Sequence, residues 1–533
     1  MIHAYLLLTI SLLFAVLLLV MVGERLKISY PIFLVIGGLL ISFVPGIPSV
    51  AIDPDLVFLI FLPPILYAAA WYTSWHDFWK WKRPIGLLAV GLVILTSAIV
   101  AYLTEWMIPG FPLAAGFLLG GIISPPDAVA ATSVLRGTAI PKRAIIILEG
   151  ESLINDASSL IVFKFALAAI LTHSFVLQEA VGTFFLMAGM GIVVGLLVGM
   201  AAYQLHRLLP TTPSIDIALT LITPYVMYIG AEYFHFSGVL AVVSGGLFLS
   251  YRSHKFLSSQ SRLQATVVWQ TLIFLLNGTV FILIGLDLPV IVNGLQEVSQ
   301  WEAITYGLII SMAIIVIRVI WTYTMTFIPR FLFRSIRETE KSPGWKGPFV
   351  VSFAAMRGVV SLAAAFSIPL LLPGGEAFPY RNLILFLTFV VILVTLVGQG
   401  LLLPWIIRWI KVEEIDDHRP EGEQEAELQL YLKQASLKVL TTKHAQYIER
   451  NPLVANLRSQ LESDIALTSQ RIDSFDCNTR EQENYRRVLT DILNEQREEL
   501  VKLRDARLFS EEVLRKQAAQ LDLDEARVRG GLE

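Results

Sequence analysis

The sequence is poor in cysteine and in charge. Its 533 residues contain one cysteine, Cys477, which excludes a disulfide framework or a cysteine-rich metal site within one chain. Only 16% of the residues are charged, against about 25% in an ordinary soluble domain. Because 55% are hydrophobic, a single soluble globule is also excluded.

Motifs of soluble enzymes are missing as well. There is no G-x-x-x-x-G-K loop followed by Ser or Thr and no H-E-x-x-H pair, so ATP-driven transport by this chain is not expected. We predict that the protein is not an enzyme, carries no cofactor and binds no nucleic acid.

The few charges divide the chain near Ile410. Residues 1–410 carry 22 Lys and Arg and 18 Asp and Glu, whereas residues 411–533 carry 19 and 26. The first part predicts a transmembrane domain, and the second a charged tail of several amphipathic helices, with breaks at Pro420 and Pro452 and a loop over residues 473–479. We interpret the tail as a regulatory or dimer-supporting domain; an appendage without effect on transport is the alternative.

Apolar runs long enough to cross a hydrocarbon core of roughly 30 Å recur throughout residues 1–410. The first run is too long for a signal-peptide core, so we expect a membrane span there. The predicted fold class is all-α: a polytopic membrane protein with about 13 transmembrane helices and a helical cytoplasmic tail. The thirteen predicted spans are 4–22, 32–48, 56–72, 85–107, 112–134, 145–171, 181–205, 215–231, 237–250, 267–290, 303–328, 348–372 and 383–410.

Basic residues are concentrated in alternate loops between these spans. One set of six loops contains 17 Lys and Arg residues, and the other set contains only Arg381. Since cytoplasmic loops are enriched in Lys and Arg, the first set is predicted to be cytoplasmic. The protein is then a multi-pass protein of the cell (inner) membrane, with its N-terminus outside and its tail, including Cys477, inside.

Ionisable residues inside spans are costly in lipid and are functional candidates by default. In the fifth span, Asp127 follows two prolines that remove two backbone donors, so we predict two half-helices. Asp127 would start the second half, where its charge suits the positive end of the helix dipole. A simple proline kink with Asp127 as a cap is the alternative. The candidates are Asp127, Glu151, Asp156, Lys164, Arg318 and Arg357.

The sixth predicted span carries a polar stripe. Ser152, Asn155, Asp156 and Ser159 follow i, i+3, i+4, i+7 spacing and share one helical face. Hard monovalent cations need oxygen ligands, and a carboxyl group withdrawn from water can exchange a proton for a cation. A stripe of interhelical hydrogen bonds that holds the bundle together is the alternative.

The remaining intramembrane charges predict ion pairs. Arg357 in the twelfth span is the expected partner of Glu151, because either charge alone would be costly. Arg357 and Gly358 also interrupt their span, which predicts one irregular helix in each half, as in inverted-repeat transporters. Lys164 and Arg318 either pair with the acids or extend to the membrane interface.

Three segments carry a family resemblance. Residues 124–130 are SPPDAVA, residues 150–156 are GESLIND and residues 356–358 are MRG, with FLPP upstream at 61–64. Over nearly all of residues 1–410, the chain resembles the NhaP-type sodium/proton antiporters of the monovalent cation:proton antiporter family. The resemblance implies thirteen spans in inverted repeats, a homodimer in the lipid membrane, and a core domain that moves against a dimerisation domain to give alternating access.

The resemblance also implies roles for particular residues. Asp156 would bind the ion and the proton, and Na+ would be held by Asp156, Asp127 and Ser152. Asn155 would belong to the same site, and Glu151 would pair with Arg357. Ser159, Lys164 and Arg318 are additional candidates.

The sequence departs from that family at two places. Pro126 stands where many members have Thr, so a Thr hydroxyl is lost. Residues 65–70 (ILYAAA) lack the acidic residue that members commonly carry after the third-span prolines. Both departures concern ion coordination and leave the preference among Na+, K+ and Li+ open.

These observations predict a secondary antiporter that exchanges a monovalent cation, with Na+ first, for H+ through a single buried carboxylate. Exchange is expected to be electroneutral and to serve pH homeostasis. The rival functions are a cation channel, an intramembrane aspartyl protease that uses Asp127 and Asp156, and a membrane receptor that signals through the tail. A channel would pass current without proton coupling. Neither acid lies in a protease motif, and a receptor would leave the polar stripe unexplained.

Overall fold

The chain forms two compact units, Met1–Asp416 and Asp417–Glu533, and each is described by itself. Cys477, Pro420 and loop residues 474–478 of the sequence predictions lie outside the described residues. The computed structural model describes residues 2–26, 29–43, 54–135, 140–172, 177–286, 288–295, 298–339, 342–372, 375–412, 421–473, 479–505 and 509–530.

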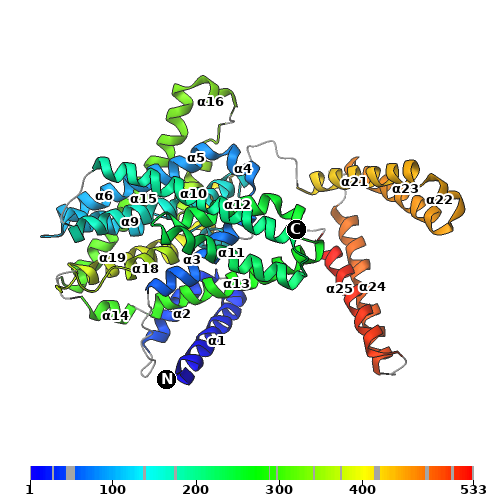
Figure 1. The fold of residues 1–533 in the computed structure, drawn as a ribbon, viewed down its shortest axis with the longest axis horizontal. Coiled ribbons are helices and arrows are strands. Elements are labelled where there is room, and N and C mark those ends of the chain that lie inside the picture. The colour runs from blue at the N-terminus through cyan, green and yellow to red at the C-terminus, as the bar shows by residue number, and fades with distance from the viewer. Residues whose placement is uncertain are drawn as a thin grey trace. The chain divides into compact units, whose positions relative to one another are not determined.

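Every named element in these described ranges is helical (Figure 1). The all-α fold class is therefore confirmed. The first unit contains α1 (Ile2–Leu26), α2 (Tyr30–Ser42), α3 (Pro54–Tyr72), α4 (Trp75–Lys80), α5 (Lys82–Gly86), the π-helix η1 (Leu87–Leu92), α6 (Val93–Met107), α7 (Leu113–Ile123), α8 (Ala128–Leu135), α9 (Lys142–Thr172), α10 (Leu177–Leu208), α11 (Pro213–Tyr233), α12 (Gly238–Phe256), α13 (Ser259–Leu286), α14 (Leu288–Asn293), α15 (Gln300–Leu332), α16 (Arg334–Thr339), α17 (Lys346–Phe353), α18 (Val359–Phe366), α19 (Arg381–Leu393), the π-helix η2 (Val394–Gln399) and α20 (Gly400–Ile410).

Within the described residues, eight helical stretches are long and apolar enough to cross a membrane. Three shorter apolar helices, Tyr30–Ser42, Leu59–Tyr72 and Leu113–Ile123, add to them. Helices occupy each of the thirteen ranges that the sequence predicts for spans, but the number of membrane crossings itself stays a prediction.

Two spans are interrupted, one in each half of the first unit. The first consists of α7, which ends at Ile123, and α8, which begins at Ala128. The second consists of α17, which ends at Phe353, and α18, which begins at Val359. Both breaks were predicted from sequence, one from adjacent prolines and one from the Arg357-Gly358 pair, and both are confirmed.

The buried apolar side chains of the first unit form two clusters. The larger draws on α1, α2, the helices from α5 to α9, the helices from α13 to α15 and the helices from α17 to α20. The smaller draws on α3, α11, α12 and the first half of α13, with α10 packed against it. α9 contributes to both, since Phe163 lies in the larger cluster and Leu153 and Ala157 lie in the smaller. α13 also contributes to both, so the polar stripe is on one of the two helices that the clusters share.

Close packing and caps explain several local features. Ser299 and Glu302 form a capping box that begins α15. At the contact between α2 and α13, a Cβ atom on Gly38 would overlap the carbonyl of Ile282, so glycine is needed for this approach.

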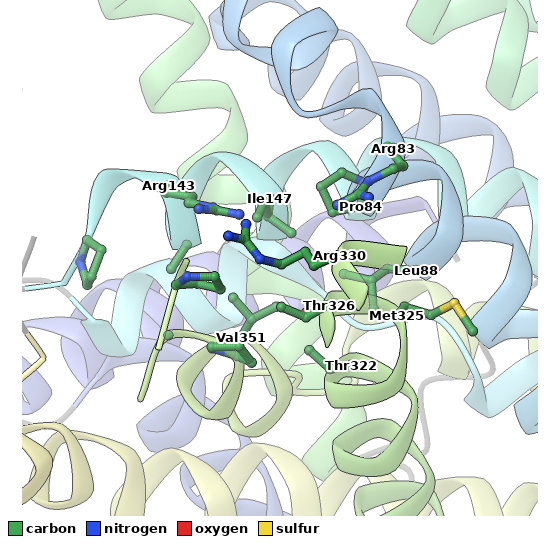
Figure 2. A pocket seen from close by; sticks show the side chains of 15 residues that line it. Arg83, Pro84, Leu88, Arg143, Ile147, Thr322, Met325, Thr326, Arg330 and Val351 are labelled. Atoms are coloured by element: carbon green, nitrogen blue, oxygen red, sulfur yellow. The ribbon is translucent and has the colours of Figure 1, made fainter. Parts of the chain in front are cut away.

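Elsewhere, the ends of α5, α9, α15 and α17 surround a pocket with three arginines in its lining (Figure 2).

The second unit is a set of helices. α21 packs against α23, and α24 packs against α25. Arg497 on α24 forms ion pairs of 2.5 Å with Asp522 and Glu525 on α25. The helical tail is confirmed, whereas its regulatory or dimer-supporting role stays a prediction. The helices are α21 (Glu421–Lys443), α22 (Ala445–Arg450), α23 (Pro452–Asp473), α24 (Thr479–Asp505) and α25 (Glu511–Gly530).

Candidate functional site

The first break places Asp127 at the start of α8. Its Oδ1 atom accepts hydrogen bonds from the backbone N–H groups of Val129 at 2.8 Å and Ala130 at 3.3 Å. This is N-cap geometry, and it puts a negative charge at the positive end of the α8 dipole. The predicted half-helices and the alternative role of Asp127 as a cap are thus both present.

The second break crosses the first at Asp127. The backbone N–H of Asp127 donates to the carbonyl of Met356 at 2.6 Å, which joins the two extended stretches. Gly358 lies against the Asp127 carboxylate, and a Cβ atom at Gly358 would overlap Asp127 Oδ2. Glycine at position 358 therefore allows the start of α18 to approach this acid.

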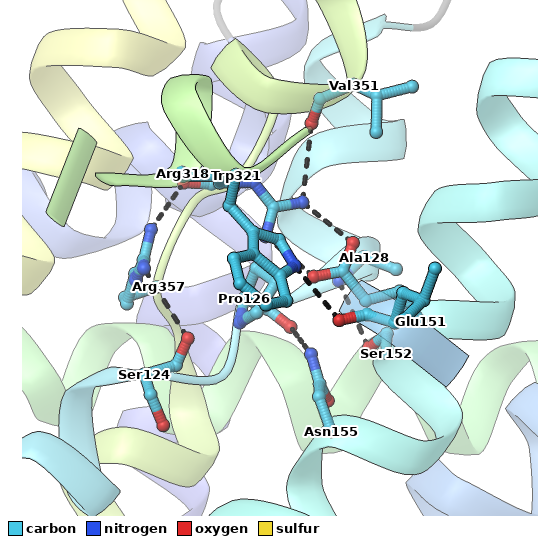
Figure 3. A network of polar contacts seen from close by, with 12 residues as sticks. Ser124, Pro126, Ala128, Glu151, Ser152, Asn155, Arg318, Trp321, Val351 and Arg357 are labelled. Atoms are coloured by element: carbon cyan, nitrogen blue, oxygen red, sulfur yellow. Dashed lines mark hydrogen bonds and ion pairs between the residues drawn. The ribbon is translucent and has the colours of Figure 1, made fainter. Parts of the chain in front are cut away.

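The stripe on α9 faces the first break. Ser152 Oγ accepts a hydrogen bond from the backbone N–H of Ala128 at 3.3 Å, and Asn155 Nδ2 donates to the carbonyl of Pro126 at 3.1 Å (Figure 3). These bonds satisfy backbone groups that the interruption leaves without helical partners. Part of the stripe therefore does hold helices together, as the alternative interpretation required. Ser159 is different, because its hydroxyl donates to the Asp156 carbonyl of its own helix at 2.9 Å.

Asp156 lines a cavity of about 670 Å³ between the two apolar clusters. The side chains of Asp127 and Ser152 line the same cavity, whereas Asn155 is not among its lining residues. Asp156 is 7% exposed, and among the described residues no lysine or arginine forms an ion pair with it. The cavity thus brings together two carboxylates and a hydroxyl, the oxygen ligands that a monovalent cation requires.

The expected pairing of Glu151 with Arg357 is wrong. Arg318 on α15 binds Glu151 through two nitrogens, with N–O distances of 2.6 and 2.7 Å (Figure 3). The second of these nitrogens also donates to the Val351 carbonyl, in the last turn of α17, at 3.3 Å. Arg318 therefore pairs with an acid, one of the two roles proposed for it from sequence.

Arg357 binds backbone carbonyls at the first break instead. Its Nε donates to the carbonyl of Ile123 at 3.0 Å, and its terminal nitrogens donate to those of Ser124 at 3.4 Å and Ala355 at 3.1 Å. Ile123 ends α7, so a positive charge lies at the negative end of that helix dipole. The prediction was wrong because the carbonyls at the C-terminal end of a helix, and not only a carboxylate, can stabilise a buried guanidinium group.

Lys164 pairs with Glu232, near the end of α11, rather than with the acids of the cavity. The Lys164 Nζ atom lies 2.8 and 3.1 Å from the two carboxylate oxygens of Glu232. Glu232 also accepts a hydrogen bond from the backbone N–H of Gly238 at 3.2 Å. Neither Lys164 nor Glu232 lines the cavity of Asp156.

Sequence reasoning overlooked Asn277 on α13, which is buried and lines the same cavity. Outside the sixth predicted span only charged residues were considered, and an uncharged amide on another helix escaped that criterion. Its position within an apolar run was the available signal, since polar side chains in spans commonly bond to other helices or line cavities.

Comparison with known proteins assigns this architecture to a family. The family model for the transmembrane part of sodium/hydrogen exchangers matches residues 10–409. The chain belongs to the sodium/hydrogen exchanger family. This membership makes it a multi-pass membrane protein and agrees with the resemblance found in the three motifs.

This chain matches different shares of the length of its relatives in the exchanger family. A Bacillus pumilus protein named a sodium, potassium, lithium and rubidium/H+ antiporter is 36% identical over 386 residues; these are 71% of this chain and 57% of that protein. The uncharacterized Na+/H+ exchanger YjcE of Escherichia coli is 32% identical over 521 residues, which are 94% of both chains. The Na+/H+ antiporter ApNhaP of Aphanothece halophytica is 31% identical and covers 72% of this chain and 69% of its own.

A solved structure shares the fold of this exchanger-family chain. The sodium proton antiporter MjNhaP1 from Methanocaldococcus jannaschii at pH 8 superposes with a TM-score of 0.58 at 20% identity. The match covers 74% of this chain and 99% of that one.

Proposed function

We propose that the protein is a secondary antiporter that exchanges a monovalent cation for H+, with Na+ as the first candidate and Li+ and K+ as alternatives. The observation that carries the proposal is the position of Asp156. It is buried, lacks a cationic partner among the described residues, and lines a cavity beside the crossing of two broken helices. The names of the relatives, which describe them as cation/H+ antiporters, also support cation/proton exchange.

In this proposal Asp156 carries either a proton or the cation. When the cation arrives from the cavity, the proton leaves Asp156, and the carboxylates of Asp156 and Asp127 with the Ser152 hydroxyl supply oxygen ligands. Asp127 keeps its hydrogen bonds to the start of α8 in both states. Asn155 acts indirectly, since it positions the backbone before Asp127 through the Pro126 carbonyl.

The cavity also suggests the state of the transport cycle. Residues that line it include Glu24, Thr73 and Glu149, which lie beside loops that the Lys and Arg count places in the cytoplasm. The structure would then be open to the cytoplasm. Movement of the larger apolar cluster, which contains both breaks, against the smaller one would open the site to the other side. Insertion in the cell membrane with the tail inside, and assembly as a homodimer, belong to the same proposal.

Purified protein in proteoliposomes with an entrapped pH dye tests this function. Addition of Na+ should cause proton movement in the wild type and none in Asp156→Asn. Ser158→Ala is a matched control on the same helix, because among the described residues that hydroxyl bonds only to the Ile154 carbonyl of α9, at 3.3 Å. Proton movement that persists in Asp156→Asn would refute the assignment, and cation current without proton movement would favour a channel.

A further inference from the structure

One buried polar side chain in the wall of the ion cavity has no structural partner. Asn277 on α13 is 3% exposed and lines the same cavity as Asp156. Among the described residues, none forms a hydrogen bond with its amide. Burial of an amide without a hydrogen bond is costly, so the available partner of Asn277 is whatever the cavity contains.

Two other polar side chains of α13 do have structural partners. Ser261 Oγ donates to Asp216 Oδ2 on α11 at 2.7 Å, and Thr279 Oγ1 donates to the Leu275 carbonyl of α13 itself at 2.8 Å. The first bond joins two helices, and the second closes back on its own helix. Asn277 does neither, so helix packing does not account for an amide at this position.

Asn277 and Asp156 lie at similar levels along their helices. Asp156 is 14 residues after Lys142, where α9 begins. Asn277 is 18 residues after Ser259, where α13 begins. A rise of 1.5 Å per residue places them about 21 and 27 Å along helices that both follow loops predicted to be cytoplasmic. Asn277 is therefore near the level of Asp156 rather than at the start of its helix.

The packing of α13 also brings it to the crossing of the broken helices. α13 packs against α18. The residue before α18, Gly358, lies against the Asp127 carboxylate and lines the cavity together with Asn277. The amide thus faces the space that Asp127 and Asp156 share.

An amide supplies a ligand without supplying a proton. Its carbonyl oxygen can coordinate a cation as a carboxylate oxygen does, but the group does not titrate. The cavity of about 670 Å³ has room for a cation that keeps several water molecules. A fourth oxygen ligand from Asn277 would therefore leave the exchange of one proton for one cation at Asp156 unchanged.

We propose that the Asn277 amide oxygen completes the coordination shell of the cation at Asp156 and thereby sets the preference among monovalent cations. The inference rests on the proposed function, because it assigns a ligand to the same site. A small cation such as Li+ is held by fewer oxygens than a larger one such as Na+. Loss of one neutral oxygen should therefore weaken the binding of Na+ more than that of Li+.

Two measurements on the full chain test this role with matched variants. Asn277→Leu removes the amide at similar side-chain size. Thr279→Val is the control on the same helix, because Thr279 does not line the cavity and bonds to its own helix. Thermal unfolding in detergent, with Na+ or Li+ replacing choline at constant ionic strength, measures binding to the folded state. Exchange in proteoliposomes measures KM and the maximal rate for each ion.

Asn277→Leu should need about tenfold more Na+ than the wild type for the same rise in melting temperature, and its KM for Na+ should rise by a similar factor. The KM for Li+ should rise less, and the maximal rate should change less than KM. Thr279→Val should match the wild type. An unchanged Na+ requirement in Asn277→Leu would overturn the ligand, and equal factors for Na+ and Li+ would overturn its role in ion preference.

A second variant keeps the test valid if Asn277→Leu does not fold. Asn277→Asp retains an oxygen ligand and adds a negative charge, so at alkaline pH it should bind Na+ at least as tightly as the wild type. Binding weaker than in the wild type would overturn the proposal. A wild type that neither binds nor exchanges Na+ would refute the proposed function itself. Wild-type exchange together with normal Na+ binding in Asn277→Leu would refute only the Asn277 ligand.

Discussion

Two ion pairs on α9 differ sharply in burial. The Glu151 and Arg318 side chains are 0% and 1% exposed, whereas those of Lys164 and Glu232 are 41% and 33% exposed. A buried pair separates only at a large cost, because each charge would be left without water or a partner. A partly exposed pair can exchange its partner for solvent. The first pair thus fixes the helices around the site, and the second permits movement.

The largest effect is expected at the buried pair. Arg318→Gln strands the Glu151 carboxylate and should lower the free energy of unfolding by about 3 to 5 kcal/mol. Adding Glu151→Gln should recover much of this loss, because two neutral amides replace an uncompensated charge. Thermal melts of the two single variants and the double variant in detergent measure the coupling.

The same cycle separates the two candidate partners of Glu151. Combined with Arg357→Gln, the Glu151→Gln substitution should bring no recovery, since Arg357 binds carbonyls and leaves no carboxylate behind. Recovery in the Arg357 cycle and its absence in the Arg318 cycle would contradict the pairing that the structure shows.

An intermediate effect is expected for Arg357→Gln alone. The change removes charge-assisted hydrogen bonds to the carbonyls of Ile123, Ser124 and Ala355. Because the Gln amide can still donate to a carbonyl and no charge is left without a partner, we expect a net cost of about 1.5 to 3 kcal/mol. Loss of repulsion from nearby Arg318 offsets part of this cost. The melting temperature should therefore fall less than in Arg318→Gln. A larger fall would mean that Arg357 neutralises an acid as well.

The contrast between these arginines shows what the sequence could predict. Adjacent prolines before Asp127 sufficed to predict a break, because they remove backbone donors whatever surrounds them. The polar stripe followed from helical spacing alone. Both are local features, and the structure has both.

The partners of the charges could not be predicted in the same way. Glu151 and Arg318 are 167 residues apart, and their contact depends on α17, which packs against both α9 and α15. The pairing of Glu151 with Arg357 was expected because Arg357 lies in the MRG segment that carries the family resemblance. Its true partners, carbonyls at the end of α7, are present in every sequence and therefore give no compositional signal. The Lys164–Glu232 pair was not predicted because Glu232 lies between the predicted spans 215–231 and 237–250, and only charged residues inside spans were considered.

The smallest effect is expected at the exposed pair, and it bears on the stoichiometry of the proposed exchange. Lys164→Gln should change stability by about 1 kcal/mol or less. Lys164 lies eight residues from Asp156, about 12 Å along the helix, and it already has Glu232 as a partner. Nothing in this geometry couples its proton to ion binding.

If Asp156 alone alternates between one proton and one monovalent cation, each cycle moves no net charge. Exchange in proteoliposomes clamped with valinomycin should then be insensitive to membrane potential in both the wild type and Lys164→Gln. Glu232→Gln is the matched control for loss of the pair without loss of the lysine. Acceleration by either polarity in the wild type that vanishes in Lys164→Gln would mean that the exposed pair titrates. The division between a fixed buried pair and a passive exposed pair would then be wrong.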